Sequence, residues 1–498
     1  MAQLRLATST ALVALFGAAM AQAQVTPEQV WQNWQKLSAS YGQALVADSV
    51  TRQGDTLVVK GVKTSMAQDG ATMTGALDEV RFRDLGDGTV EATASESYVM
   101  QVVMPAEDGT ADSLNITLSQ PGMRVIAAGN GPETSYTYDL PNMSLAIQAL
   151  ENGVALADIT AKAAGLTALY RFTTAADVIK ADLAMDMQTL GFAVSAQDKA
   201  DTFELTGNIA ALKLASGGTF LGIEAMEDLP KALRDGMSFT TALSYGAGSF
   251  DINGTEGGVP TTVLATNESG RFDFALNGET LRYGLGGTGM NLTLSGGDIP
   301  FPQVKVSYGE AAFDMMIPVA KTAVPVDFSL LTRIVDLAVS DEIWGMMDPT
   351  GTLPRDPATL IVDAKGKVQL TTDLFDEAAM EALGEAAPGD LHALTLTQIT
   401  AKAAGAALTG MGDFTFDNND LTTFDGIPAP TGKIELTLSG GNGLLDKLVA
   451  MGLIPSEEAM GMRMMLAMLA KPGENPDVLT SVLEFKDKGF YANGQRLQ

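Results

Sequence analysis

Residues 53–63 read Gln-Gly-Asp-Thr-Leu-Val-Val-Lys-Gly-Val-Lys, a Gly-containing turn that leads into a short run of apolar and β-branched residues. This combination is typical of a hairpin turn followed by a strand. Strands joined by such tight turns pair antiparallel, because parallel strands need long crossover connections. The pattern recurs from about residue 50 to residue 320, with further turns predicted at Asp69-Gly70, Gly86-Asp-Gly88, Asp108-Gly109, Asn130-Gly131, Asn253-Gly254, Asn277-Gly278 and Gly296-Gly-Asp298.

Helical patterns interrupt this series of strands. Thr26 and Gln29 form a capping-box pattern at the start of a helix that carries Trp31 and Trp34 on its apolar face. Leu330, Ile334, Leu337 and Ala338 have the three- and four-residue spacing of a second apolar helical face. The second apolar face predicts a helix over residues 327–347. Further helices are predicted at 221–235, 376–383, 444–451 and 457–469.

The fold class expected from these patterns is α+β: a long, twisted, mostly antiparallel sheet in two related halves, with helices packed on its concave face. The two halves are suggested by a repeat, because Ile-Thr-Ala-Lys-Ala-Ala-Gly occurs at 159–165 and again at 399–405. Because Ala is abundant, coincidence is the alternative. We place a β-rich half with the N-terminal helix at 24–320 and an α+β half with a Met-rich helical pair at 321–498.

The first 23 residues have the pattern of a cleavable export signal. Arg5 supplies the positive region, Leu6 to Met20 the apolar region, and Ala21-Gln-Ala23 the small residues that a signal peptidase requires. We expect cleavage after Ala23 and a periplasmic protein, with an uncleaved membrane anchor as the alternative. No later segment has eighteen or more uninterrupted apolar residues, so no transmembrane segment is expected in the mature chain.

The composition excludes several functions. The net charge of −29 disfavours nucleic acid and anionic surfaces; solubility explains this charge, and a cationic partner is the alternative. The chain has no Cys and one His, His392, so thiol chemistry and clustered His sites are excluded. Hydrophobic residues make up 46% of the chain, which is ample for a core. We expect no enzymatic activity, no cofactor and no metal site of these kinds.

Two local motifs resemble ligand sites. Asp413 to Gly426 is rich in Asp and Asn, the oxygen ligands that calcium prefers, but its spacing does not fit an EF-hand. Gly284-Leu-Gly-Gly-Thr-Gly289 matches the dinucleotide-binding glycine pattern. That pattern must open a helix, whereas Met290-Asn-Leu-Thr-Leu continues as a strand. We therefore interpret the first motif as a solvated hairpin loop and the second as part of a sheet.

The C-terminal helices carry the most suggestive side chains. Met460, Met464 and Met468 share one helical face, and Met465 extends it. Methionine is adaptable and suits surfaces that accept varied apolar partners. The candidate site for an apolar ligand comprises these four residues with Trp344. The alternative is that they fill the core beneath a curved sheet.

Two stretches resemble a known family. They are Ser340-Asp-Glu-Ile-Trp-Gly-Met-Met-Asp348-Pro, continuing through Leu353-Pro-Arg-Asp-Pro-Ala-Thr359, and the C-terminal segments Gly440-Gly-Asn-Gly-Leu-Leu-Asp446, Met451-Gly-Leu453 and Gly489-Phe-Tyr-Ala-Asn-Gly494. The chain resembles an uncharacterised family of bacterial exported proteins, filed as a domain of unknown function. It is more loosely similar to the YdgA-like and AsmA-like envelope proteins. The resemblance implies a β-rich exported protein without catalytic residues, and the remoter relatives imply lipid handling or envelope maintenance.

The leading hypothesis is a non-enzymatic periplasmic protein that holds or conveys an apolar ligand, such as a lipid, in a groove between the sheet and the helices. The alternative is a structural or interaction protein of the envelope that docks a protein partner through its acidic surface. A hydrolase that uses paired carboxylates is a third possibility.

Overall fold

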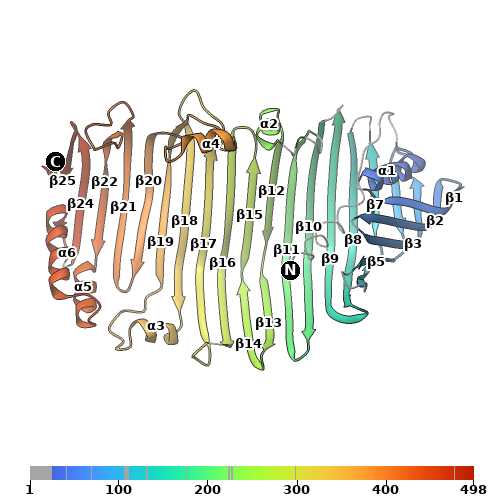
Figure 1. Cartoon of the computed structure of the whole chain (residues 1–498), viewed down its shortest axis with the longest axis horizontal. Coiled ribbons are helices and arrows are strands. Elements are labelled where there is room, and N and C mark those ends of the chain that lie inside the picture. Colours follow the sequence, from blue (N-terminus) through green and yellow to red (C-terminus); the bar gives the residue numbers. More distant parts are fainter. Residues whose placement is uncertain are drawn as a thin grey trace. The chain divides into compact units, whose positions relative to one another are not determined.

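The computed structural model describes residues 25–40, 42–68, 70–105, 111–129, 133–175, 178–221, 225, 228–297, 299–475 and 477–498. The predicted signal peptide and the predicted cleavage after Ala23 lie outside these residues, as do the turns predicted at Asp108-Gly109 and Asn130-Gly131. The described chain is mostly antiparallel sheet with a few helices, as expected (Figure 1). Among the described residues, no helix combines the length and apolarity needed to cross a membrane.

The chain divides into two compact units, one within residues 1–224 and 241–263 and the other within residues 225–240 and 264–498. It passes between them within β12 (Ser238–Tyr245) and β14 (Val259–Asn267) as well as near residue 224. The boundary predicted at residue 320 lies in the second unit, in the connection between β17 and β18.

The first unit begins with α1, whose predicted capping box is confirmed. The Thr26 backbone N–H donates to Gln29 Oε1 at 2.9 Å, and the Gln29 N–H donates to Thr26 Oγ1 at 3.3 Å. The elements of this unit are α1 (Pro27–Ser40), β1 (Ala44–Gln53), β2 (Thr56–Gln68), β3 (Ala71–Asp84), β4 (Val90–Ala94), β5 (Ser97–Pro105), β6 (Ala111–Ser119), β7 (Arg124–Gly129), β8 (Glu133–Glu151), β9 (Val154–Ala175), β10 (Val178–Asp198), β11 (Asp201–Phe220) and β13 (Gly248–Glu256).

The core of the first unit lies between α1 and the first strands. Phe82 of β3 is completely buried and meets Trp34 edge-on, with 5.0 Å between the ring centroids, and Trp31 lies 6.2 Å away. The two tryptophans therefore pack on the sheet. Edge-to-face aromatic pairs add to the stabilisation from buried area.

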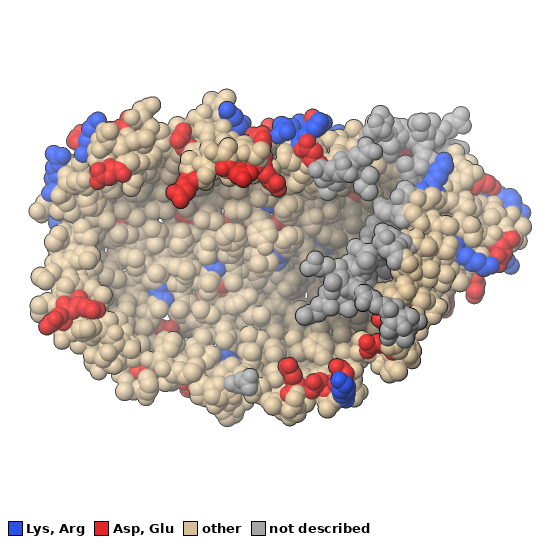
Figure 2. All heavy atoms as spheres, viewed as in Figure 1, with Lys and Arg blue, Asp and Glu red and all other residues tan. Residues whose placement is uncertain are grey.

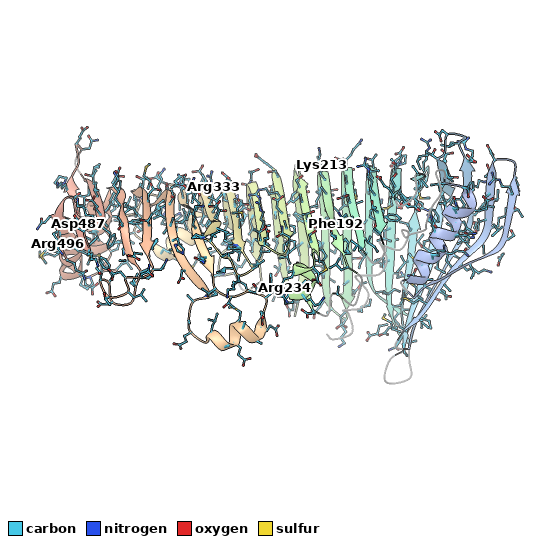
Figure 3. All side chains as sticks on the ribbon, turned by 90° about the horizontal axis from the view of Figure 1, so that it is seen from above. Phe192, Lys213, Arg234, Arg333, Asp487 and Arg496 are labelled. Carbon is cyan, nitrogen blue, oxygen red and sulfur yellow. The ribbon has the colours of Figure 1, made fainter. Side chains whose placement is uncertain are left out.

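The long strands of the first unit have one apolar and one polar face. Phe192 of β10 pairs with Gly207 of β11, which in turn pairs with Phe250 of β13. Gly207 leaves room for the Phe192 ring, because a Cβ there would lie 2.3 Å from the ring in its present position. Lys213 of β11 lies on the opposite side of the sheet from Phe192 (Figure 3). Alternation of this kind is expected where only one face of a sheet is apolar.

The second unit is an antiparallel meander in which each strand from β15 to β22 pairs with the next. Its elements are α2 (Leu229–Arg234), β15 (Ser269–Leu276), β16 (Thr280–Gly296), β17 (Val304–Pro318), β18 (Val326–Val339), α3 (Asp341–Met347), β19 (Ala358–Leu370), α4 (Glu377–Leu383), β20 (Gly389–Ala403), β21 (Ala406–Asp417), β22 (Ala429–Ser439), α5 (Gly441–Ala450), α6 (Ser456–Leu469), β23 (Lys471–Pro472), β24 (Val478–Lys486), β25 (Gly489–Ala492) and β26 (Gln495–Arg496).

The helix predicted over 327–347 is wrong for most of its length. Residues 326–339 form β18, and only Asp341–Met347 are helical. Leu330 and Ile334 are four residues apart, which fits either one helical turn or two strand periods. A register shift between Ile334 and Leu337, with Asp336 at φ 55°, then places Leu337 on the same face after three residues. The bulge thus imitates helical spacing.

Two smaller expectations differ from the structure. The turn predicted at Asn253-Gly254 is wrong, because both residues lie within β13 and the chain turns at Gly257-Gly258. The helix predicted over 221–235 is confined to α2, residues 229–234, among the described residues. The helices predicted at 376–383, 444–451 and 457–469 are confirmed as α4, α5 and α6 with small changes of bounds.

The repeated heptapeptide occupies different positions in its two copies. The first copy lies inside β9, where Gly165 has φ 61°, and the second leaves β20 and enters the turn at Gly405, with φ 83°. Both copies belong to antiparallel strands. The division into two related halves stays a prediction.

Candidate functional site

The candidate site is an apolar groove on the sheet of the second unit. It has a volume of about 460 Å³ and lies over β18, β19, β20, β21 and β22 next to α5. Except for Thr359 and Lys402, its lining residues are all aliphatic: Ile334, Leu337, Ala358, Thr359, Leu360, Ala401, Lys402, Ala403, Ala406, Ala407, Leu408, Leu438 and Leu444.

Strand register brings these residues together from distant parts of the sequence. Ile334 pairs with Leu360, Leu360 with Ala401, Ala401 with Leu408, and Leu408 with Leu438. Paired residues in an antiparallel sheet point to the same face. One apolar row therefore crosses five neighbouring strands.

The alternation within each strand extends this row into an apolar face. By strand alternation, Ala358, Leu360, Val362 and Ala364 of β19 share the groove side, whereas Asp363 and Lys365 lie on the other side together with the buried Ile361. Leu360 is 43% exposed. The face is therefore apolar and still partly open to solvent, a combination that marks binding surfaces.

Figure 2 shows the face of the second unit that carries α4. It is hollowed, and most of its surface is uncharged, whereas Asp and Glu side chains gather along its rims. On the polar side of the sheet, Nη1 of Arg333 on β18 lies 3.4 Å from Oε2 of Glu310. Arg333 is labelled along this side of the sheet in Figure 3. The distribution of charge thus separates an apolar face from charged margins.

α5 forms one wall of the groove through Leu444, and Asp477 holds its first turn. The Asp477 carboxylate accepts the backbone N–H groups of Asn442 and Gly443, each at 2.8 Å. Gly440 precedes the helix with φ 71°, and a Cβ there would lie 2.2 Å from the Gly405 carbonyl oxygen. A carboxylate at a helix start satisfies free N–H groups and complements the helix dipole.

We predict that Asp477→Ala lowers the stability of α5 against local unfolding by about 1–2 kcal/mol, the usual effect of losing an N-terminal cap. Faster amide hydrogen exchange in residues 441–450 would measure this change. Glu474→Ala, at an exposed position nearby, is the matched control and should leave exchange in α5 unchanged. Equal exchange in both variants would contradict the assigned role of Asp477.

The four methionines of the predicted site lie outside this groove. Met460, Met464, Met465 and Met468 are all on α6, and each retains 60% or more of its exposure. The interpretation in which they fill the core is therefore wrong. α6 is tied to α5 by Arg463, which contacts Asp446 and Asn442, and its last carbonyl, on Leu469, accepts bonds from Ser481 and Asn493.

Trp344, the fifth predicted residue, is partly buried on α3 and does not line the groove. α3 ends at Asp348, whose backbone N–H donates to the Trp344 carbonyl at 2.7 Å. The Asp348 side chain is almost fully buried and accepts the N–H groups of Thr352 at 3.0 Å and Leu353 at 2.7 Å. This carboxylate therefore fixes the loop that follows α3.

We predict an acid-sensitive loop at Asp348. Burial raises the pKa of this carboxyl, but the N–H donors of Leu353 and Thr352 outweigh it and hold the pKa below the ordinary value. Because the folded-state pKa is the lower one, the stabilisation is present above the unfolded pKa, about 3.9, and is lost as pH falls through the folded pKa. Trp344 fluorescence in a Trp31→Phe/Trp34→Phe chain would follow the change.

Asp348→Asn should loosen the loop at neutral pH and abolish this acid transition, since an amide cannot replace the ionised acceptor. Asp341→Asn is the control, because the Asp341 side chain is 83% exposed and pairs only with Arg355 among the ion pairs found. An acid transition that survives in Asp348→Asn would contradict the prediction.

The two motifs have the backbone conformations that the sequence predicts, a strand for Gly284–Gly289 and a loop between β21 and β22 for the acidic segment. Gly284–Gly289 lies within β16 and pairs with its neighbours on both sides. In the acidic loop, Asp420 accepts bonds from Thr422, Thr423 and Lys488. Within the described part of the chain, no three His, Cys, Asp or Glu side chains are grouped so that they could hold a metal ion.

The sequence predicts a groove but not the residues that line it, although part of their signal is present in the sequence. The alternation of apolar and charged residues in Ala358–Lys367 indicates a sheet with one apolar face. Of the two C-terminal helices, α5 borders the groove through Leu444, whereas the predicted methionines lie on α6.

Comparison with known proteins places most of the second unit, together with residues 242–263 of the first, in a family. A family model described as an uncharacterized protein conserved in bacteria (DUF2125) matches residues 242–494, slightly more than half of the chain and the whole of the groove. No curated protein and no solved structure matches the chain. The looser similarity to YdgA-like and AsmA-like envelope proteins is thus not shown. The chain belongs to DUF2125, the family of uncharacterized proteins conserved in bacteria.

Proposed function

We propose that this chain is a non-enzymatic periplasmic protein that holds the acyl part of a lipid in the groove of the second unit. The observation that carries the proposal is the continuous row Ile334–Leu360–Ala401–Leu408–Leu438, which lines an open groove with aliphatic side chains. An acyl chain is itself aliphatic, so burying it there removes apolar surface of both partners from water.

The geometry of the groove favours an extended apolar ligand over a compact polar one. Pockets for polar metabolites carry several convergent polar groups. Here only Thr359 and Lys402 could provide such groups at the lining. In this proposal the helices border the apolar face, α5 through Leu444, and the acidic rims keep the loaded protein soluble.

The first test is to ask what the protein carries and what it takes up. Full-length protein exported from bacteria would be purified without detergent, extracted with organic solvent and examined by mass spectrometry for lipids. The purified chain would also be titrated with cis-parinaric acid, a fatty acid whose fluorescence rises in apolar surroundings. A bound lipid, and saturable fluorescence that the extracted lipid displaces, support the proposal.

Two results would contradict it. A protein that is purified without lipid and does not increase the fluorescence of cis-parinaric acid would rule out an acyl ligand. Salt-sensitive co-purification of one defined protein, again without lipid, would favour an envelope interaction protein that docks through its acidic surface.

A further inference from the structure

The apolar residues of α6 differ in exposure according to their type. Ala459 is buried, and Leu466 and Leu469 are partly buried, so these three residues face the rest of the unit, whereas Ala467 is exposed. The methionines face solvent, with exposed fractions of 63% at Met460, 43% at Met462, 62% at Met464, 60% at Met465 and 65% at Met468. Leu and Met exchange readily in protein cores. Burial of apolar surface alone therefore does not explain why Met occupies the outer face.

Three of these methionines form a compact group. Met465 and Met468 are three residues apart on the helix, and Met464 and Met468 are four apart, so their Cβ atoms lie about 5–6 Å from each other. Met464 and Met465 are adjacent and about 5 Å apart by the same helical geometry. Each side chain is unbranched with three rotatable bonds, so the three thioether sulfurs can converge on one point. Met460 lies one turn earlier, within reach as a fourth.

The charges around this group do not oppose a cation. Arg463, the one cationic residue of α6, is neutralised by Asp446 on α5. The chain as a whole has a net charge of −29, which raises the local concentration of cations. Divalent ions such as Ca²⁺ and Mg²⁺ need oxygen ligands, whereas thioether sulfur is a soft ligand that selects Cu(I).

We propose that Met464, Met465 and Met468 form a binding site for a soft monovalent cation, Cu(I) or its analogue Ag(I), on the exposed face of α6. The chain has no Cys, so no thiolate competes for such an ion. The groove is lined by no methionine. The cation site is therefore independent of the proposed lipid function, and either can fail without the other.

The test compares the full chain with Met464→Leu/Met465→Leu/Met468→Leu. Cu(I) would be titrated without oxygen against bicinchoninate, a coloured Cu(I) chelator, and Ag(I) nitrate would be used in chloride-free buffer. The leucines keep the face apolar and of similar volume. Met411→Leu is the matched control, because Met411 is 61% exposed but lies on β21.

The wild-type chain and Met411→Leu should bind one Cu(I) equally, and the triple variant should bind it at least about tenfold more weakly, because even residues that only support metal ligands change affinity by this much. X-ray absorption of the Cu(I) protein should show sulfur as the only ligand type. Equal affinity in the triple variant, an equal loss in Met411→Leu, no binding to the wild type, or a nitrogen or oxygen shell would each overturn the proposal. Circular dichroism would establish that each variant is folded.

Discussion

Ala401→Trp is expected to weaken cis-parinaric acid binding by at least about tenfold. Ala401 lies in the middle of the apolar row, paired with Leu360 on one side and Leu408 on the other. An indole at this position occupies the part of the groove that an acyl chain would fill. Displacing roughly 60 Å² of apolar contact costs about 1.4 kcal/mol, which is a factor of ten in affinity.

Thr409→Trp is the matched control for this variant. Thr409 follows Leu408 directly but points to the opposite face of β21, where it pairs with Thr400 and Thr437. The same bulky residue therefore enters the same strand without entering the groove. Unchanged binding in Ala401→Trp, or an equal loss in Thr409→Trp, would show that the ligand does not lie in this groove.

The features that the sequence predicts well depend on neighbouring residues. The capping box needs only Thr26 and Gln29, and both of its hydrogen bonds are present. The turn at Gln53-Gly54 joins β1 and β2, and the turn at Asn277-Gly278 joins β15 and β16; in both cases the two strands pair with each other. Such turns are predictable because turn residues act through their own backbone angles.

The conformation of β18 cannot be predicted from the spacing of its apolar residues. The spacing from Leu330 to Ile334 fits a helix and a strand equally, and the bulge at Asp336 then produces a three-residue step that only a helix should give. What decides the conformation is the pair of neighbours, β17 and β19, which satisfy the backbone groups of β18 on both sides. Those partners lie in other parts of the sequence.

The groove could not be assembled from the sequence for the same reason. Ile334 and Leu438 are more than a hundred residues apart, and they share a row only because four successive strand registers align, including the shifts at Asp363 and Leu396. A one-residue slip in any register would turn a strand's apolar side away. The Met cluster, in contrast, was visible from spacing alone, although its exposure depends on how α6 packs against α5 and β24.

Phe82→Ala is expected to destabilise the first unit by about 3–5 kcal/mol, the usual effect of removing a buried aromatic ring. The Phe82 side chain has no exposed surface, and it is the residue against which both Trp31 and Trp34 pack. Its loss leaves a cavity beneath α1 that two large indoles cannot close without moving off the sheet. Phe82→Leu should cost less, because most of the volume remains filled.

The three tryptophans allow this effect to be assigned to one unit. Trp31 and Trp34 belong to the first unit and Trp344 to the second. In a Trp344→Phe background, urea unfolding followed by fluorescence therefore reports α1 and its sheet, and Phe82→Ala should shift that transition to lower urea. In a Trp31→Phe/Trp34→Phe background, Trp344 should unfold as before. Val46→Ala, at a half-exposed position on β1, should change stability by no more than about 0.5 kcal/mol. A loss in Phe82→Ala as small as that in Val46→Ala would mean that α1 is not held by this aromatic cluster.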